Sequence, residues 1–440
     1  MQSSYRLTFV YMTTIISLLL LWFYVMPPHD DDPYILPTSI ILSNQSSNNK
    51  NHHPFISSSQ STDRLCTPHT YNQGKWVRKR IHVKNNSTHS FQLNVNYNCP
   101  SHFAHKCFAR NDIELQRNKQ IAEWQWQPDD CDLLPMDAYP LAKHLSTHPL
   151  LFVGDSITQL QYESMSCLLG TFMTTPKTPT NMTGGDKKIK VSELIYSLPK
   201  STDEDDNDNN NSNTIISPSL AYLRSDFLVR VDDFKLIQPF EKEGDLLGVG
   251  HNFPWVHALS RFDYIVINTG AHWHTNVRWG PNTTEEELLQ GFRDAMTIVF
   301  DYLKKVVQPH QRVWIRSTPF GHKNCSRYTK PASLTSPLHP PTGQQGEYEW
   351  HLFPVFDAVW REWINDWNQK HTFDTRFAYL DISDMTNLRG DAHSKPDRDC
   401  LHTCLPGPVD DWNRLLYHEI GRHSLEQAKL ETTKLQQHSS

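Results

Sequence analysis

One serine of this chain stands where a serine can act as a nucleophile. Gly154-Asp155-Ser156 closes a short apolar segment, 150–154, and a helical segment, 156–169, begins at once. The carboxyl end of a buried parallel strand is where α/β sheets place their ligands, and a helix N-terminus offers free amides to a developing oxyanion. The tripeptide alone is better explained by a serine that simply caps the helix.

A possible partner for this serine lies far along the chain, in Asp399-Cys400-Leu401-His402. Asp and His three residues apart can share one face of a helical turn, where the carboxylate would hold the imidazole in the tautomer that accepts a serine proton. Alone this spacing is weak, and a solvated loop explains it better. A strand–Gly-Asp-Ser–helix unit early in an α/β domain, with Asp-x-x-His before its last helix, is more specific. This order is that of the SGNH/GDSL hydrolase architecture.

A third segment brings possible oxyanion donors to the same sheet edge. The apolar strand expected at 264–268 runs into a glycine turn, so the side chain of Asn268 or the backbone amide of Gly270 could donate to a developing negative charge. For each residue alone, an ordinary strand-ending turn explains the pattern as well. His272 and His274 follow, but no third ligand stands at a recognisable spacing. We therefore expect no metal site, and surface or substrate contacts for these histidines.

Alternating strands and helices must position these residues. Apolar runs and helical periodicity follow one another from residue 150, and the helix after Thr284 carries a capping box with Glu287. Such alternation predicts a three-layer α/β fold, with helices on both faces of a parallel sheet. The acidic, Asn-rich segment 201–214 is expected to be a disordered surface insertion. Strands are expected at 150–154, 264–268, 312–317 and 377–382, and helices at 156–169, 284–307, 348–371 and 409–427.

The composition of the 440 residues favours a folded enzyme or binding protein. Apolar residues make up 38% and charged residues 20%, but 13 Trp, 16 Tyr and 20 Phe are too many for an unfolded chain. The net charge of −6, with no dense run of Lys and Arg, argues against nucleic-acid binding. Collagen, coiled-coil and multi-span membrane classes are excluded by the same composition.

The N-terminal segment predicts a membrane anchor. Residues 7–26 carry no charge, and this length crosses a hydrocarbon core of ~30 Å as a helix. Arg6 precedes the segment and three aspartates follow it, so we expect residues 1–6 in the cytosol and the body across the membrane. The alternative is a cleaved signal peptide and a secreted protein, but no clear small-x-small cleavage site follows. Residues 27–65, rich in Ser, Asn, Pro and His, would form a flexible stem.

Cysteines and glycosylation motifs agree with a lumenal body. The eight cysteines are an even number, which suggests four disulfides in an oxidising compartment, and their spacing is not that of a zinc site. Eight cysteines can pair in many ways, so the sequence alone decides no pairing. Each N-x-S/T motif is a weak signal by itself. These motifs begin at Asn44, Asn85, Asn86, Asn181, Asn210, Asn282 and Asn324.

Several motifs follow one another in a fixed order: GKWV (74–77), WQWQPDDC (124–131), LFVGDSITQLQYESMSCLL (151–169), NTGAHW (268–273) and DCLHTCLPGPVDDWNRLL (399–416). In this order they resemble the trichome-birefringence-like (PC-esterase) family of polysaccharide O-acetyltransferases. The resemblance covers nearly the whole body of the chain. It is much more specific than Gly-Asp-Ser alone.

The resemblance implies the organisation and setting of the protein. A Cys-rich module at 66–131 would precede an SGNH-like catalytic domain at 132–428 and a tail at 429–440. Family members are typically single-span Golgi proteins that acetylate wall polysaccharides. This implies a glycan acceptor and an acetyl donor (acetyl-CoA or an acetylated intermediate) as co-substrate, with no bound cofactor. The implied disulfides are Cys66–Cys131, Cys99–Cys167, Cys107–Cys404 and Cys325–Cys400. Cys400 and Cys404, from the last two pairs, lie on either side of His402 in the sequence.

Three positions depart from the family pattern. The family usually has Arg three residues after the serine, where this chain has Gln159, so a positive charge is lost there. His274 stands where a second Trp is common, and residues 109–112 blur a Gly-Arg-x-Asp motif.

Several polar and aromatic residues are candidates for contact with the sugar, but for every aromatic one, core packing explains the position better. The candidate substrate contacts are Gln159, Tyr162, His272 and Trp273, with Trp124, Trp126 and Trp412 as further aromatic positions.

The sequence thus predicts an O-acetyltransferase that works by double displacement. His402 takes the proton of Ser156, Asp399 orients His402, and the amides of Ser156 and Gly270 with Asn268 hold the oxyanion. A sugar hydroxyl then accepts the acetyl group. Two alternatives stay open: an acetyl-esterase with the same three residues, and a membrane-tethered glycan binder without catalysis.

Overall fold

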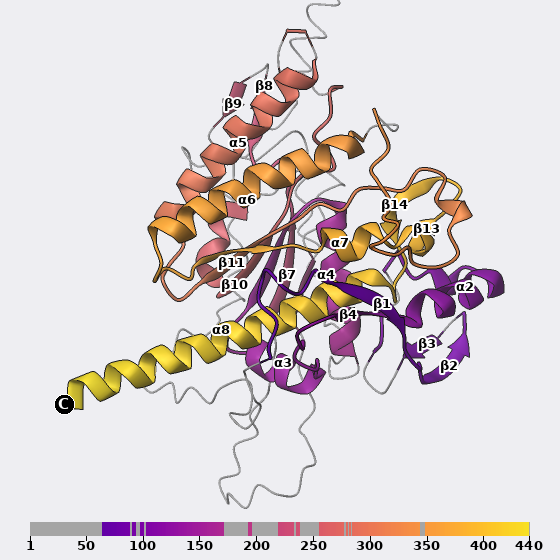
Figure 1. Cartoon of the computed structure of the whole chain (residues 1–440), viewed down its shortest axis with the longest axis horizontal. Helices are drawn as coiled ribbons and strands as arrows, with labels where there is room; N and C mark the ends of the chain where they lie inside the picture. The colour runs from indigo at the N-terminus through magenta and orange to yellow at the C-terminus, as the bar shows by residue number, and fades with distance from the viewer. Residues whose placement is uncertain are drawn as a thin grey trace, which may run out of the picture. The chain divides into compact units, whose positions relative to one another are not determined.

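A mostly parallel sheet lies at the centre of the fold (Figure 1). The computed structural model describes residues 64–88, 90–93, 97–100, 103–170, 192–195, 219–232, 235–237, 255–276, 279, 281–282, 284–343 and 348–439. Within them the strand order is β12-β11-β10-β5-β7-β6, and all neighbours run parallel except β6, which is antiparallel to β7. The strands are β5 (Leu150–Gly154), β6 (Ser192–Ile195), β7 (Ser219–Arg224), β10 (Tyr264–Ile267), β11 (Arg312–Arg316) and β12 (Phe377–Leu380).

Helices cover both faces of the sheet, as the alternating pattern predicts. Figure 1 shows α5 and α6 on one side of it and α8 with α3 on the other. Helix α4 packs against β5 and β7 and contacts α3 and α8. The α/β fold is therefore confirmed. The helices are α3 (Ala138–Leu145), α4 (Ser156–Leu169), α5 (Glu285–Val306), α6 (Phe353–Lys370), α7 (Ser383–Asn387) and α8 (Pro408–Ser439).

The strongest local signals in the sequence give the elements expected from them. β5 and α4 have the predicted bounds, and every residue of β5 is buried because helices cover both faces of its sheet. At the start of α5, Thr284 Oγ1 accepts the amide of Glu287, and the Glu287 carboxylate accepts the amide of Thr284. This is the predicted capping box.

Two helix boundaries differ from the prediction. The helix expected at 348–371 starts as a short 3₁₀ turn, Trp350–Leu352, and α6 begins at Phe353 with Pro354 in its first turn, where the missing amide costs no hydrogen bond. Helix α8 continues to Ser439, beyond the end predicted at residue 427. The segment lacks Gly and Pro and is rich in Lys, Leu and Gln, which favour helix.

The Cys-rich segment folds onto the sheet domain. β1 (Gly74–Arg78) pairs antiparallel with β4 (Trp124–Pro128), and these strands are joined to the rest by polar contacts. The indole of Trp76 donates to the carbonyl of Met385 at 2.8 Å, and the amide of Trp126 donates to Asp411 Oδ1 at 3.2 Å. The described parts of 66–131 and of 132–428 thus lie in one compact unit. This segment also contains β2 (Val83–Ser87), β3 (Ser90–Leu93), η1 (Cys107–Ala109) and α2 (Asp112–Ala122).

Several predictions fall outside the described residues. These are the cytosolic tail 1–6, the anchor 7–26, nearly all of the stem 27–65 and the insertion 201–214. Among the helices that the structure describes, none combines the length and the apolarity that a membrane crossing requires. The glycosylation motifs outside the described residues are those at Asn44, Asn181 and Asn210.

Acid is expected to destabilise the packing of α8 through His423. This side chain is buried against the ring of Tyr264. Burial, followed by the nearby charge of Arg312, lowers the pKa of His423 to about 3. The folded state therefore keeps His423 neutral, whereas the unfolded chain binds a proton below its pKa of ~6.5. Stability is fully present above ~6.5 and falls by about 1.4 kcal/mol per pH unit between there and ~3.

The variant His423→Phe removes this proton linkage. Urea unfolding at several pH values between 7 and 4 should show the free energy of unfolding of wild type falling relative to that of the variant as the pH decreases. Two curves that stay parallel over this range would show that His423 is not held neutral by the fold.

Candidate active site

Ser156, His402 and Asp399 form a hydrogen-bonded row. Ser156 Oγ lies 2.8 Å from His402 Nε2, and His402 Nδ1 lies 3.0 Å from Asp399 Oδ2. The carboxylate can only accept at Nδ1, so the imidazole proton sits there and Nε2 is left to accept the serine hydroxyl. The sheet and the hairpin of β13 (His393–Lys395) and β14 (Asp399–Thr403) thus bring together the two distant segments.

The start of α4 leaves the hydroxyl of Ser156 available. Asp155, not Ser156, is the N-cap: its carboxylate accepts the amides of Ile157 and Thr158 at 2.9 and 3.4 Å. The alternative of Ser156 as a simple cap is therefore wrong. Gly154 has φ +154°, and a Cβ atom there would lie 2.4 Å from the carbonyl oxygen of Asn268, so the turn into the helix needs glycine.

Asp399 and His402 lie on a strand, not on the helical turn that their spacing predicted. β14 (Asp399–Thr403) pairs antiparallel with β13 (His393–Lys395), with an irregular register between them. Asp399 Oδ1 folds back to accept the amides of Leu401 and His402 at 3.2 and 3.1 Å. The same carboxylate then reaches the imidazole, so a local side-chain turn replaces the helical one.

Hydrogen bonds to Asp399 keep it ionised. Burial by itself would raise the pKa of Asp399. The hydrogen bonds from the His402 side chain and from the amides of His402 and Leu401 outweigh that effect and hold the pKa well below its usual range. The carboxylate therefore stays charged in mild acid and can orient His402 there.

The side chain of Asn268 is not free to hold an oxyanion. Its amide nitrogen donates to the carbonyl of Arg316 and to Thr318 Oγ1, both at 2.8 Å, which uses its two hydrogens. This prediction is corrected: Asn268 joins the ends of β10 and β11. Gly270 is buried against the side chain of Thr318. The amides of Ser156 and Gly270 remain the candidate oxyanion donors.

The aromatic residues considered as sugar contacts mostly lie in the core, which is the explanation that the sequence favoured for them. Tyr162 is 1% exposed and packs edge-on against Phe103. Trp273 is fully buried and stacks on Trp279 with ring centroids 4.3 Å apart. Neither can touch a sugar in this conformation. Trp126 and Trp412 are buried, whereas Trp124 is partly exposed.

The polar candidates lie at the same sheet edge. Gln159, half-buried one turn after Ser156, donates to Glu163 Oε1 at 2.9 Å. His272 is partly exposed, with Nε2 3.8 Å from Asp226. Arg224, the last residue of β7, is beside Gly154 in the sheet register and pairs with Asp226 through two hydrogen bonds. An arginine therefore ends the strand next to β5, with its charge paired to Asp226.

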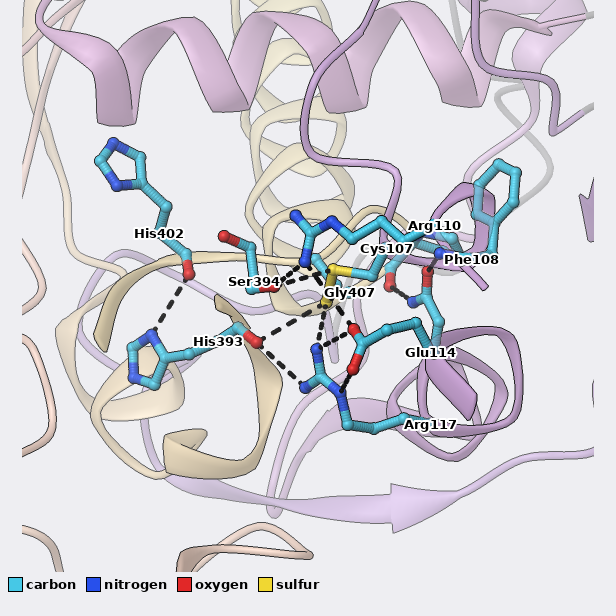
Figure 2. Close-up of a disulfide and its surroundings, with 12 residues drawn as sticks. Cys107, Phe108, Arg110, Glu114, Arg117, His393, Ser394, His402 and Gly407 are labelled. Carbon is cyan, nitrogen blue, oxygen red and sulfur yellow. Dashed lines mark hydrogen bonds and ion pairs between the residues drawn. A yellow bond between two sulfur atoms is a disulfide. The ribbon is translucent and has the colours of Figure 1, made fainter. Parts of the chain in front are cut away.

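Four disulfides join the pairs implied by the resemblance: Cys66–Cys131, Cys99–Cys167, Cys107–Cys404 and Cys325–Cys400. Figure 2 shows the disulfide at Cys107 close to Ser394 of β13. Arg117 donates to the carbonyl of His393 at 3.0 Å, and Arg110 donates to that of Ser394. The Cys-rich segment thus holds the β13–β14 hairpin by one covalent bond and two guanidinium groups.

Removal of the Cys107–Cys404 bond is expected to affect both stability and reactivity. The bond closes a separation of 297 residues, so the double variant Cys107→Ala/Cys404→Ala should lose about 2–5 kcal/mol in urea unfolding. Because the hairpin positions His402, the labelling rate of Ser156 by a fluorophosphonate should also fall. Cys66→Ala/Cys131→Ala is the control, since that pair joins segments with none of the three site residues; an equal loss of labelling in both variants would contradict this role.

The sequence analysis did not identify Arg110 and Arg117 as residues that hold the β13–β14 hairpin. The blurred motif 109–112 already contained Arg110, but its target carbonyl belongs to a hairpin almost at the other end of the chain.

Among the described residues, no group of three or more His, Cys, Asp or Glu side chains is arranged to hold a metal ion. Asn282 and Asn324 are exposed, and Asn85 and Asn86 lie on β2.

A family model and several known proteins match this chain. Residues 134–419 match the PC-esterase model, described as a GDSL/SGNH-like acyl-esterase family found in Pmr5 and Cas1p. Trichome birefringence-like protein 25 of Arabidopsis thaliana is 25% identical over 67% of this chain and 66% of its own length. Xyloglucan O-acetyltransferase 1 of the same plant is 24% identical over 80% of each chain, and xylan O-acetyltransferase 6 of Oryza sativa subsp. japonica is 26% identical over 73% of this chain and 60% of its own. Because the family model matches more than half of its length and spans the hydrogen-bonded row, the chain belongs to the PC-esterase family.

Proposed function

We propose that the protein is an O-acetyltransferase that moves an acetyl group through an acyl-serine to a hydroxyl of a cell-wall polysaccharide or glycan. The observation that carries the proposal is the row of Ser156, His402 and Asp399, with 2.8 and 3.0 Å between successive side chains. A nucleophile within hydrogen-bond distance of a base that a third group orients is the arrangement of covalent acyl transfer.

The reaction proceeds in two displacements. His402 Nε2 takes the proton of Ser156 while Oγ attacks the acetyl carbonyl, and the donor's leaving group departs with that proton. An acceptor hydroxyl then gives its proton to His402 and attacks the acetyl-serine, and Ser156 leaves with the proton. The amides of Ser156 and Gly270 hold both oxyanions. The general base contributes about 10²–10⁴-fold and each oxyanion donor about 10²–10³-fold in rate.

The names of the relatives support the acceptor class. Two of them are named for acetyl transfer to xyloglucan and to xylan, which are wall polysaccharides. Acetyl-CoA or an acetylated intermediate would supply the acetyl group. The uncharged segment 7–26 supports a single anchor in the Golgi membrane, with the body in the lumen.

The second candidate function is hydrolysis, because the matched family is described as acyl-esterases. The same three residues serve both reactions, and the outcome depends on whether water or a sugar hydroxyl reaches the acyl-serine. A non-catalytic glycan binder is a third possibility that the hydrogen-bonded row argues against.

One experiment separates these functions. The full chain is incubated with acetyl-CoA or an acetylated aryl donor and with xyloglucan or xylan oligosaccharides, and products are followed by NMR. Transfer predicts new ester signals on the sugar that require the acceptor, with little free acetate. Release of acetate from acetylated oligosaccharides, without ester gain, would identify an esterase. Failure of a fluorophosphonate to label Ser156 would leave only the binder.

A further inference from the structure

We propose that His105, from the Cys-rich segment, is a positioning residue for His402: its ring is the wall that keeps the catalytic imidazole aligned with Ser156. The inference rests on the proposed function, since it assigns a role in the same acyl-transfer site. It gives the Cys-rich segment a part in the reaction beyond folding.

Main-chain and covalent contacts place His105 beside the catalytic hairpin. The carbonyl of His105 accepts the amide of Leu405 at 2.9 Å. Two residues further on, Cys107 is bonded to Cys404. Both anchors of this short segment thus lie within three residues of His402, so the His105 ring has a defined position relative to the imidazole.

The two imidazoles are stacked with their planes nearly parallel. Their ring centroids are 5.4 Å apart and their planes differ by 14°. The side chain of His402 is 13% exposed and that of His105 18%, so each ring shields the other from solvent. Rotation about the terminal torsion of a histidine has broad minima. A nearly parallel neighbouring ring limits that freedom on one side of the imidazole.

A buried carboxylate holds the edge of His105. His105 Nδ1 lies 3.2 Å from Glu163 Oε2, and Glu163 is 3% exposed. Glu163 belongs to α4, two turns after Ser156, and its other oxygen accepts a hydrogen bond from the side-chain amide of Gln159. A buried carboxylate needs such partners. The helix that presents the nucleophile therefore also orients the wall of the base.

The physical consequence is a loss of alignment when the ring is removed. A displacement of about 1 Å between reacting groups can cost about 10²-fold in rate. We expect loss of the ring to lower the rate of Ser156 acylation by about 10- to 100-fold through kcat, with the KM for acceptor within about 2-fold of wild type. A phenyl ring, which has the same flat face, should restore alignment.

Matched double variants isolate the ring from the charge of Glu163. Glu163→Gln keeps the hydrogen bond with Gln159 and leaves no unpaired buried charge when His105 is replaced. The comparison is His105→Phe/Glu163→Gln against His105→Ala/Glu163→Gln, with His105→Leu/Glu163→Gln as a volume-filling alternative if the alanine form does not fold. His69→Ala, an exposed histidine of the same segment, is the control.

The readouts are the rate constant for fluorophosphonate labelling of Ser156 and the kcat and KM of acetyl transfer, with folding checked by circular dichroism. The phenylalanine form should retain at least about a third of the wild-type labelling rate, and the alanine or leucine form should be at least about 10-fold slower. Equal rates in the ring-containing and ringless forms overturn the inference while the proposed function stands. No labelling of wild type would refute the proposed function itself, and the inference with it.

Discussion

Ser156→Ala is expected to lower kcat for acetyl transfer by about 10⁴-fold or more, because no other nucleophile can form the acyl intermediate. The hydroxyl of Ser156 is hydrogen-bonded to His402, and the N-cap of α4 is Asp155. The variant should therefore fold normally. Mass spectrometry after mixing with donor alone should find acetyl on the peptide that contains Ser156 in wild type, and none in the variant.

A hydroxyl of the same helix provides the matched control. Ser166 is buried on α4 and donates to the carbonyl of Tyr162 at 3.0 Å, so Ser166→Ala removes a similar group without touching the imidazole. That variant should keep its activity within a few-fold. If Ser156→Ala retained more than about 1% of the wild-type rate, direct transfer from donor to acceptor would replace the covalent route.

The sequence contained the nucleophile unit almost completely. An apolar run, a glycine and a helix-forming segment are local signals, and β5 and α4 follow them residue by residue. The capping box before α5 is equally local. The contact of Ser156 with His402 and Asp399 was expected from motif order, since no local pattern indicates that β14 returns to the start of α4.

What the sequence could not predict depends on contacts between distant segments. The spacing of Asp399 and His402 suits a helical turn, but pairing with β13 extends the chain and the side chain of Asp399 makes the turn instead. Asn268 looked like an oxyanion donor until β11 supplied acceptors for both of its hydrogens. In each case a tertiary partner decides between two local possibilities.

The role proposed for His105 depends most clearly on contacts between distant segments. Nothing about a histidine two residues before a cysteine indicates a role, and the segment around it has no periodicity. Its neighbours in space are His402 and Glu163, both far along the chain. The departure at Gln159 gains meaning from the same contacts, because its side-chain amide donates to one oxygen of Glu163 while His105 lies against the other.

Asp399→Asn should reduce kcat by about 10⁴-fold while leaving the hairpin folded. Oδ1 of Asp399 accepts the amides of Leu401 and His402 and also lies 3.1 Å from His402 Nδ1, while Oδ2 lies 3.0 Å from the same nitrogen. An asparagine keeps its single oxygen on the two amides, because losing both would unfold the turn. Its NH₂ group then faces Nδ1 and forces the proton onto Nε2, where the imidazole can no longer accept the serine hydroxyl.

The control for this variant is Asp397→Asn, which removes an exposed carboxylate from the same hairpin turn. Both variants should unfold at the same urea concentration as wild type within error, so a difference in kcat reports the tautomer alone. Because the pKa of Asp399 lies well below its usual range, wild-type activity lost in mild acid is not due to this carboxylate. Activity of Asp399→Asn within about 10-fold of wild type would mean that the polar contacts of β14 orient His402 without a carboxylate, and the third member of the row would have to be reassigned.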